Sequence, residues 1–169
     1  MTGDIIILMD YHPITAQIVE ILKQNNLWYE TFEHEPVRTS EEAAKVRYGY
    51  SIEQGAKALI VRAQSKERSE FIMLVMPAHL RLDTKKAKQY LQTKDLRFAT
   101  EEEIERITNG VQVGGVPPFG NLFSLKTIVD SKLFENEKIV FNAGDRSFSV
   151  AMFSQDYKNI VNPIITDIT

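Results

Sequence analysis

The segment Gln112–Gly120 constrains the fold more than any other stretch of this 169-residue chain. Its last seven residues include three glycines and two prolines. Glycine permits positive φ angles and close backbone approach, whereas proline fixes φ and lacks an N–H. The segment can therefore form neither a helix nor a central strand. Apolar, strand-like sequence flanks it, so we expect a rigid loop set into the body of a domain, with a plain connector as the alternative.

Composition indicates an ordinary folded domain. Hydrophobic residues make up 43% of the chain and charged residues 25%, so we expect one domain over residues 1–169. The net charge of −3 argues against a uniformly basic nucleic-acid-binding surface but leaves a local basic patch open. Cysteine is absent, which excludes disulfides, thiolate metal sites and a cysteine nucleophile. The apolar run Ile5–Met9 is too short to span a bilayer, and no basic n-region of a signal peptide precedes it. We therefore expect a cytoplasmic protein with no membrane partner.

Hydrophobic periodicity predicts short helices and strands in mixed order. Capping-box spacing, which marks helix starts, occurs at Thr39–Glu42 and Thr100–Glu103, and Asp83 is a further N-cap candidate. Because strict strand–helix alternation is missing, the pattern predicts an α+β fold with a mixed, barrel-like sheet surrounded by short α-helices. Strands are expected at residues 28–34, 55–61, 71–76, 96–99, 125–130, 138–143 and 148–153.

Lys57 is the first candidate for chemistry. On a strand it shares a face with Leu59 and Val61, because side chains alternate between faces. If that face is interior, the ammonium group enters a partly desolvated place where it needs a partner. Otherwise, Lys57 is a strand-end lysine that extends to solvent.

Two further segments are candidates. Backbone N–H groups between Gly114 and Gly120 could bind a carbonyl oxygen or a phosphate, although the prolines supply none. The run Asn142–Asp145 could place an amide and a carboxylate at a strand end, or form an ordinary β-turn.

The remaining polar residues give weaker signals. The three histidines lack metal-ligand spacing, and no nucleophile elbow is present. The lysines near residue 90 are either a solvated helix face or phosphate contacts, namely Lys85, Lys86, Lys88 and Lys94.

Four motifs in order resemble the YbaK/prolyl-tRNA-synthetase-associated domain family. They are Phe32-x-His34-Glu35-Pro36-Val37-x-Thr39-x-Glu41-Glu42-Ala43, Gly55-Ala56-Lys57-Ala58-Leu59, Gly114-Gly115-Val116-Pro117-Pro118-Phe119-Gly120 and Asn142-Ala143-Gly144. The likeness extends over about residues 14–162 and resembles a freestanding editing protein.

The resemblance implies hydrolysis of the ester between a wrong amino acid and the 3′ end of a tRNA, as a trans-editing deacylase. It implies a functional role for Lys57 and a loop that holds the aminoacyl carbonyl with backbone groups. The resemblance implies neither a metal ion nor a cofactor. It implies that the substrate's 2′-hydroxyl orients the attacking water. An aminoacyl-tRNA synthetase is a further expected partner. The residues implied to bind substrate are Val37, Gly114, Gly115, Pro118, Gly120, Asn142 and Gly144.

Two other functions stay open from the sequence. One is a non-catalytic module of the same fold that binds a tRNA end or a protein. The other is an unrelated α+β protein in which the glycine loop is only structural. Lys57 and the intact glycine loop favour the enzyme.

Overall fold

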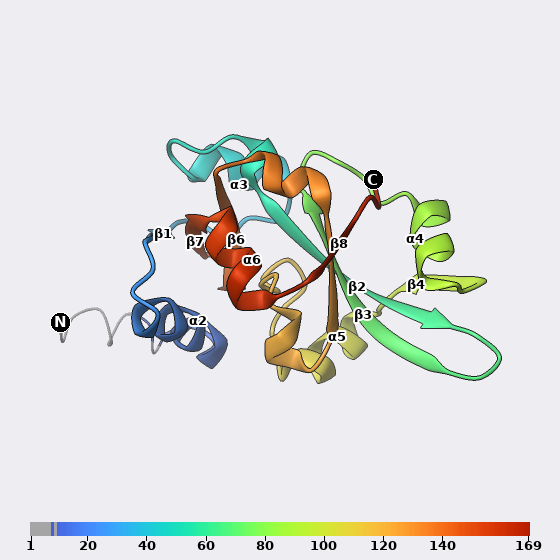
Figure 1. The fold of residues 1–169 in the computed structure, drawn as a ribbon. Helices are drawn as coiled ribbons and strands as arrows, with labels where there is room; N and C mark the ends of the chain where they lie inside the picture. The colour runs from blue at the N-terminus through green and yellow to red at the C-terminus, as the bar shows by residue number, and fades with distance from the viewer. Residues whose placement is uncertain (1–7, 9) are drawn as a thin grey trace.

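The computed structural model describes Leu8 and residues 10–169 (Figure 1). The apolar run Ile5–Met9 therefore falls almost wholly outside the described residues. The described part contains five α-helices and three short 3₁₀ helices. They are α2 (Pro13–Gln24), α3 (Ser40–Val46), η1 (Ile52–Gln54), α4 (Thr84–Leu91), α5 (Glu101–Thr108), η2 (Gly120–Phe123), η3 (Ser131–Glu135) and α6 (Ser154–Val161). None of these helices is long and apolar enough to cross a membrane.

The strands form two sheets. One has three antiparallel strands in the order β1-β7-β6, with β1 at Tyr29–Glu33, β6 at Lys138–Asp145 and β7 at Phe148–Phe153. The other has five strands in the order β4-β2-β3-β5-β8. Its strands are β2 (Ala56–Gln64), β3 (Ser69–Pro77), β4 (Asp95–Phe98), β5 (Lys126–Asp130) and β8 (Ile164–Thr166), of which β3, β5 and β8 pair in parallel.

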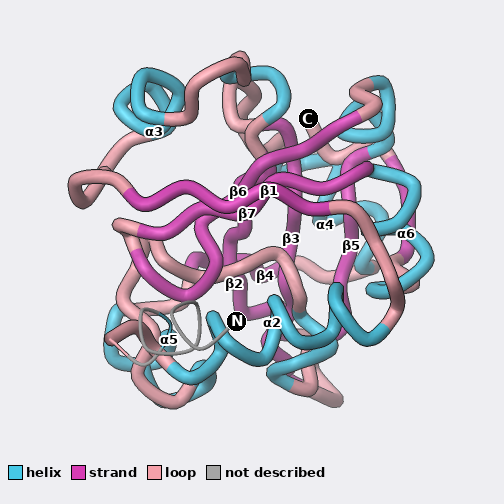
Figure 2. The backbone as a smooth tube through the Cα atoms, turned by 90° about the vertical axis from the view of Figure 1, so that its left-hand side faces the viewer, coloured by secondary structure: helices cyan, strands magenta, loops and turns pink. Residues whose placement is uncertain are grey.

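The predicted α+β class with a mixed sheet is confirmed, but the described strands do not form a closed barrel. β1 and β6 are the edges of the smaller sheet, and β4 and β8 are the edges of the larger one. Among the described residues, one isolated parallel bridge, between Gly55 and Val140, joins the two sheets. In the view of Figure 2, the strands of the smaller sheet run across those of the larger sheet.

The predicted helix starts are also observed. Thr39 caps α3 by accepting a hydrogen bond from the Glu42 backbone N–H over 3.1 Å. Thr100 and Glu103 form a complete capping box at α5, and Asp83 caps α4. These caps satisfy N–H groups that have no partner inside a helix. Helix α3 is important for the site because Arg47, the residue that caps its C-terminus, lines the cavity described below.

The main core lies between the two sheets and the helices α2 and α6. Phe119, in the glycine–proline loop, is fully buried there. Its ring lies 5.4 Å from that of Phe141 on β6 and 5.6 Å from that of Tyr157 on α6. The second half of the loop is therefore anchored in the core, as expected for a rigid loop inside a domain.

Candidate functional site

A cavity of about 230 Å³ lies at the junction of the two sheets. Pockets for small molecules usually measure about 300–1,000 Å³, so this cavity suits an aminoacyl group better than a whole nucleotide. Its walls are predominantly apolar and come from five places in the chain. These are residues within 37–47, residues 55–59, Ala78, residues within 113–116, and Asn142.

Lys57 extends from β2 into the cavity wall and is half-buried. Its Nζ donates hydrogen bonds to the carbonyl oxygens of Leu80, over 2.6 Å, and Ala78, over 3.4 Å. Partial desolvation lowers the pKa of Lys57; the nearby Glu41 opposes this shift and Arg81 adds to it. An ammonium group has three donors, so one N–H of Lys57 stays available for a ligand.

The glycine–proline loop divides into two parts. Val113, Gly114 and Val116 line the cavity, whereas Pro118 and Gly120 are buried away from it. The backbone N–H groups of Gly114 and Val116 make no hydrogen bond with any described residue. They are therefore the loop donors that a bound carbonyl oxygen could use.

Pro118 and Gly120 fix the loop in the core. The Pro118 carbonyl accepts a 2.6 Å hydrogen bond from the buried hydroxyl of Tyr157. A Cβ on Gly120 would lie 2.2 Å from Thr127 Oγ1, so glycine is required for close packing. The structure thus places both residues outside the cavity lining, although the resemblance implied substrate contact.

Gly115 and Gly144 join the loop to β6. The N–H of Gly144 donates to the carbonyl of Gly115 over 2.8 Å. Gly144 has a φ of +99°, and a Cβ there would lie 2.3 Å from Ile14 Cγ2. Neither glycine lines the cavity. Asp145, the nearby carboxylate, accepts a hydrogen bond from the Ser147 backbone N–H and also lies outside the lining.

Val37 and Asn142 both line the cavity with Lys57 and Gly114. Val37 is 5% exposed and forms part of the apolar wall. The side chain of Asn142 donates a 2.6 Å hydrogen bond to the Gly114 carbonyl. Four of the eight residues selected from the sequence therefore meet at one cavity, and the other four lie outside its lining.

Arg47 is a cavity residue that sequence reasoning missed. Its guanidinium is buried, with Nε donating to Ser149 Oγ over 3.0 Å and Nη2 donating to Asn142 Oδ1 over 2.9 Å. Burial lowers the pKa of Arg47 to about 10, so the group remains charged at neutral pH. A basic residue at a helix C-terminus is common, so the local sequence gave no signal that this one is buried.

His34 extends this polar network to the surface. Its Nε2 lies 2.8 Å from Ser149 Oγ, and its Nδ1 lies 2.9 Å from the carbonyl oxygen of Glu35. Ser149 Oγ in turn donates to Asn142 Oδ1 over 3.1 Å. The histidine of the His-Glu-Pro motif therefore supports the cavity wall through Ser149 and does not itself line it.

A family model for the aminoacyl-tRNA editing domain matches residues 34–160, which include all of these cavity residues. The chain belongs to the aminoacyl-tRNA editing domain family. Two curated relatives are similar to this chain over most of their length. One is the "Multifunctional Ser/Thr-tRNA deacylase ProXp-y" of Escherichia coli, 28% identical over 148 residues, which are 87% of each chain. The other is the "Prolyl-tRNA editing protein ProX" of Acetoanaerobium sticklandii, 24% identical over 85% of this chain and 88% of that protein.

A solved structure supports the editing-domain fold. It is the "Crystal structure of a putative trans-editing enzyme for prolyl tRNA synthetase", with a TM-score of 0.77 and 22% identity. The match covers 94% of this chain and 98% of that one. At this identity the similarity establishes the architecture alone.

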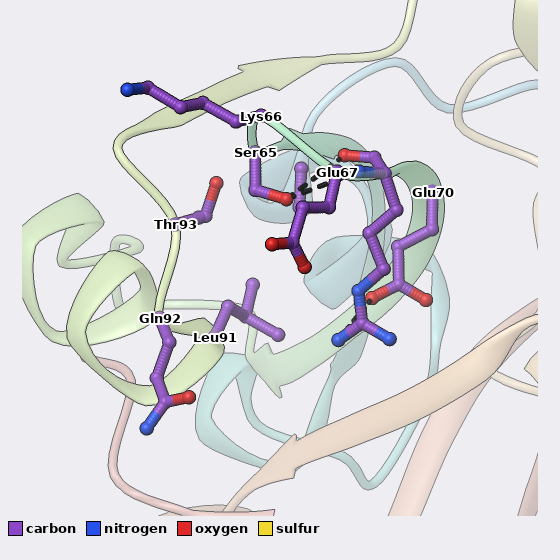
Figure 3. A pocket seen from close by; sticks show the side chains of 9 residues that line it. Ser65, Lys66, Glu67, Glu70, Leu91, Gln92 and Thr93 are labelled. Atoms are coloured by element: carbon purple, nitrogen blue, oxygen red, sulfur yellow. Dashed lines mark hydrogen bonds and ion pairs between the residues drawn. The ribbon is translucent and has the colours of Figure 1, made fainter.

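The editing domain has a second, more open cavity at the far end of β2 (Figure 3). It lies between the β2–β3 turn and the end of α4, and measures about 430 Å³. Its charged side chains have both signs, and Ser65 bonds only to Arg68 within the same turn. Figure 1 shows the turn of this hairpin at the right-hand edge of the molecule, beyond the segment in which β4 pairs with the end of β2.

Part of the lysine cluster on and after α4 has a structural role. Lys86 Nζ donates to Asp167 Oδ2 over 2.8 Å and to the carbonyl oxygen of Thr169 over 2.5 Å. Lys85 and Lys94 are exposed. Lys86 therefore ties α4 to the C-terminal segment and is poorly placed to contact phosphates.

Proposed function

We propose that this chain hydrolyses the ester bond of mischarged aminoacyl-tRNA as a trans-editing deacylase. The observation that carries the proposal is the convergence of Lys57 and the glycine loop on one small cavity within an editing domain. The two curated relatives, whose printed names are those of a tRNA deacylase and a tRNA editing protein, support the same reaction.

In the proposed reaction, a water oxygen bonds to the ester carbonyl carbon and the carbonyl oxygen gains negative charge. The free N–H groups of Gly114 and Val116 would stabilise that charge, because donors that are already fixed in position act strongly on a developing oxyanion. The carbon–oxygen ester bond then breaks, and the 3′-oxygen of the tRNA takes a proton. The products are the free amino acid and the uncharged tRNA.

Lys57 would supply a positive charge to a substrate oxygen or phosphate with its remaining N–H. The carbonyls of Leu80 and Ala78 hold the ammonium in position, so it needs little reorganisation when substrate binds. The substrate's own 2′-hydroxyl would orient the attacking water. Exposed Arg38 at the cavity margin is suited to a phosphate of the tRNA 3′ end.

A synthetase partner and action in the cytoplasm complete the proposal. Aminoacyl-tRNA released by a synthetase would be the substrate, and its 3′ end must reach the cavity. Both statements rest on the reaction proposed and have tests of their own, namely co-purification with a synthetase and localisation by fluorescence.

The testing experiment is a deacylation assay with a panel of alanyl, cysteinyl, seryl and threonyl esters on matched tRNAs. We expect at least one ester to be hydrolysed well above its spontaneous rate. Lys57→Ala should lower that rate by about a hundredfold, as loss of a preorganised charge in a site often does. Lys66→Ala, an exposed lysine of the second cavity, is the matched control and should leave the rate unchanged.

Each outcome has a defined meaning. If the protein binds tRNA but hydrolyses none of the esters in a broad panel, it is a binding module of the same fold and not an enzyme. Full activity of a folded Lys57→Ala protein would overturn the role given to Lys57.

A further inference from the structure

The side chain of His34 shares one serine hydroxyl with two residues of the cavity wall. Ser149 Oγ lies 2.8 Å from His34 Nε2. It also lies 3.0 Å from Arg47 Nε and 3.1 Å from Asn142 Oδ1. Ser149 is fully buried, whereas His34 is partly exposed and can exchange protons with solvent. A serine hydroxyl has one proton to donate, so the three surrounding groups decide which of them receives it.

Most neighbours of this hydroxyl have a fixed role as donor or acceptor. The Asn142 amide donates through Nδ2 to the Gly114 carbonyl over 2.6 Å, so its Oδ1 faces the hydroxyl as an acceptor. Arg47 Nε can only donate. His34 Nδ1 lies 2.9 Å from the carbonyl oxygen of Glu35, so Nδ1 carries a hydrogen in both protonation states. His34 Nε2 is therefore the atom in this set that can change between acceptor and donor.

Two hydrogen-bond arrangements follow from the two protonation states of His34. When the imidazole is neutral, Nε2 accepts the Ser149 proton, and Asn142 Oδ1 keeps one described donor, the Nη2 of Arg47. When the imidazole is protonated, Nε2 donates to Ser149 Oγ, whose own proton then goes to Asn142 Oδ1. Asn142 gains a hydrogen bond in this state, so its amide holds the Gly114 carbonyl more firmly.

The charged groups on the segments around His34 have both signs. They are Glu33, Glu35, Arg38, Arg47, Asp145 and Arg146. None of these carboxylates accepts a hydrogen bond from the imidazole. Arg47 donates to the same hydroxyl and therefore opposes a second positive charge, whereas the additional hydrogen bond to Asn142 favours it. Histidine is also the residue type that gains and loses a proton near neutral pH.

We propose that His34 is a positioning residue for ester hydrolysis, acting through Ser149 on Asn142 and the glycine loop. The proposal rests on the editing function above. Protonated His34 turns the Ser149 hydroxyl toward Asn142 and so fixes the loop that carries the oxyanion donors. Neutral His34 takes that hydroxyl for itself and leaves the loop less firmly held. His34 lies outside the cavity lining, so it acts without touching the substrate.

The first test compares the wild type with His34→Gln on one reactive ester by kcat/KM, across about pH 5.5–8.5. A glutamine amide keeps a donor for Ser149 but has no proton to lose. The pH dependence of the ester chemistry cancels in the ratio of the two rates. We expect the ratio of wild type to His34→Gln to fall about two- to tenfold as the pH rises, the effect of one neutral hydrogen bond. A constant ratio would overturn the proposal.

His12→Gln is the matched control for this test. Both ring nitrogens of His12 are hydrogen-bonded, to the Asn109 carbonyl oxygen and the Ile14 backbone N–H, but His12 lies outside the cavity lining. The ratio of wild type to His12→Gln should therefore stay constant across the same pH range. A ratio that falls as steeply as for His34→Gln would show that the effect is not specific to His34 and would overturn the proposal.

The second test separates the hydroxyl of Ser149 from the charge of the imidazole. In a Ser149→Ala background, His34 can still gain a proton but has no hydroxyl to turn. Adding His34→Gln to this background should therefore change kcat/KM by the same factor at every pH. A factor that depends on pH as in the wild-type background would mean that the charge alone acts, and would overturn the role of Ser149.

NMR of the wild type without tRNA tests the same hydrogen bonds, even if Ser149→Ala does not fold. We expect neutral His34 to carry its proton on Nδ1, and the side-chain amide signals of Asn142 to move as His34 is protonated. A neutral form protonated on Nε2, or Asn142 signals that do not follow His34, would overturn the proposal. If no ester reacts with the wild type, the proposed function has failed. If an ester reacts with a constant ratio of wild type to His34→Gln, this inference alone has failed.

Discussion

Asn142 is hydrogen-bonded to Gly114 across the cavity, with its Nδ2 2.6 Å from the glycine carbonyl oxygen. The same side chain accepts a hydrogen bond from Arg47 through Oδ1. One amide thus fixes both the loop that carries the proposed oxyanion donors and the buried guanidinium. The geometry of the cavity depends on this side chain even if it never touches the substrate.

Asn142→Ala is expected to lower kcat/KM for ester hydrolysis by about ten- to a hundredfold, because the loop loses its tether and misplaced donors stabilise the oxyanion poorly. The measurement is single-turnover deacylation. Asn136→Ala is the control, since Asn136 also bonds to backbone carbonyls, those of Glu53 and Leu133, but lies outside the cavity lining. Equal losses in the two variants would contradict this role.

Gly144→Ala is expected to destabilise the protein by about 3 kcal/mol or more, from a positive φ and from overpacking. The φ is +99°, and the new Cβ would lie 2.3 Å from Ile14 Cγ2 and 2.8 Å from Thr15 Oγ1. Gly49→Ala is a matched control, with a φ of +86° and nothing within 4 Å. It should cost only about 1–2 kcal/mol for backbone strain. Urea denaturation measures the stability of both variants. Equal denaturation midpoints would show that the contact with Ile14 is unimportant.

Tyr157→Phe is expected to cost about 1–3 kcal/mol, because the buried Pro118 carbonyl loses its partner. The Tyr157 hydroxyl is fully buried and donates to that carbonyl over 2.6 Å. Tyr90→Phe, at a residue that is 44% exposed, should leave the free energy of unfolding unchanged. Chemical denaturation distinguishes them; an unchanged midpoint for Tyr157→Phe would mean that the loop is held by packing alone.

Glu103 should make stability depend on pH in the acidic range. Its hydrogen bonds with Arg97 and with the Thr100 backbone lower its pKa from 4.5 to about 2. A depressed pKa means that the folded state favours the ionised form, so the stabilisation is complete above pH 4.5 and is lost as the pH falls toward 2.

Glu103→Gln should therefore be less stable than the wild type at pH 7, with the difference shrinking between pH 4.5 and 2. Glu102→Gln, in the same helical turn, removes an exposed charge that makes no ion pair with a described residue. Thermal melts across this pH range give the comparison. If the stability difference between Glu103→Gln and the wild type stayed constant across this pH range, the pKa shift of Glu103 would be contradicted.

Local signals in the sequence predicted the elements well. The capping residues Thr39, Asp83 and Thr100 marked three helix starts, because a cap depends on residues within one turn. The division into two sheets was not predicted, since it depends on pairings between distant segments such as β3 with β5. Strand β8 was also missed: it has three residues and directly follows Pro163, so no alternation can develop.

The site was predictable to a similar extent. Lys57 and the glycine loop stood out because their residue types are unusual in their local setting. Arg47 did not, because its burial depends on Asn142 and Ser149, which lie 95 and 102 residues further along the chain. Nor could the sequence separate the cavity-lining Gly114 from Gly120, which packs against Thr127 in the core.

The bridge between Gly55 and Val140 makes the site a property of the whole fold. Lys57 belongs to one sheet and Asn142 to the other, and this bridge joins the two near both residues. A folding intermediate with only one sheet formed would hold half of the cavity and could not bind an aminoacyl group. During synthesis, the cavity would therefore stay incomplete until β6, which carries Asn142, had left the ribosome.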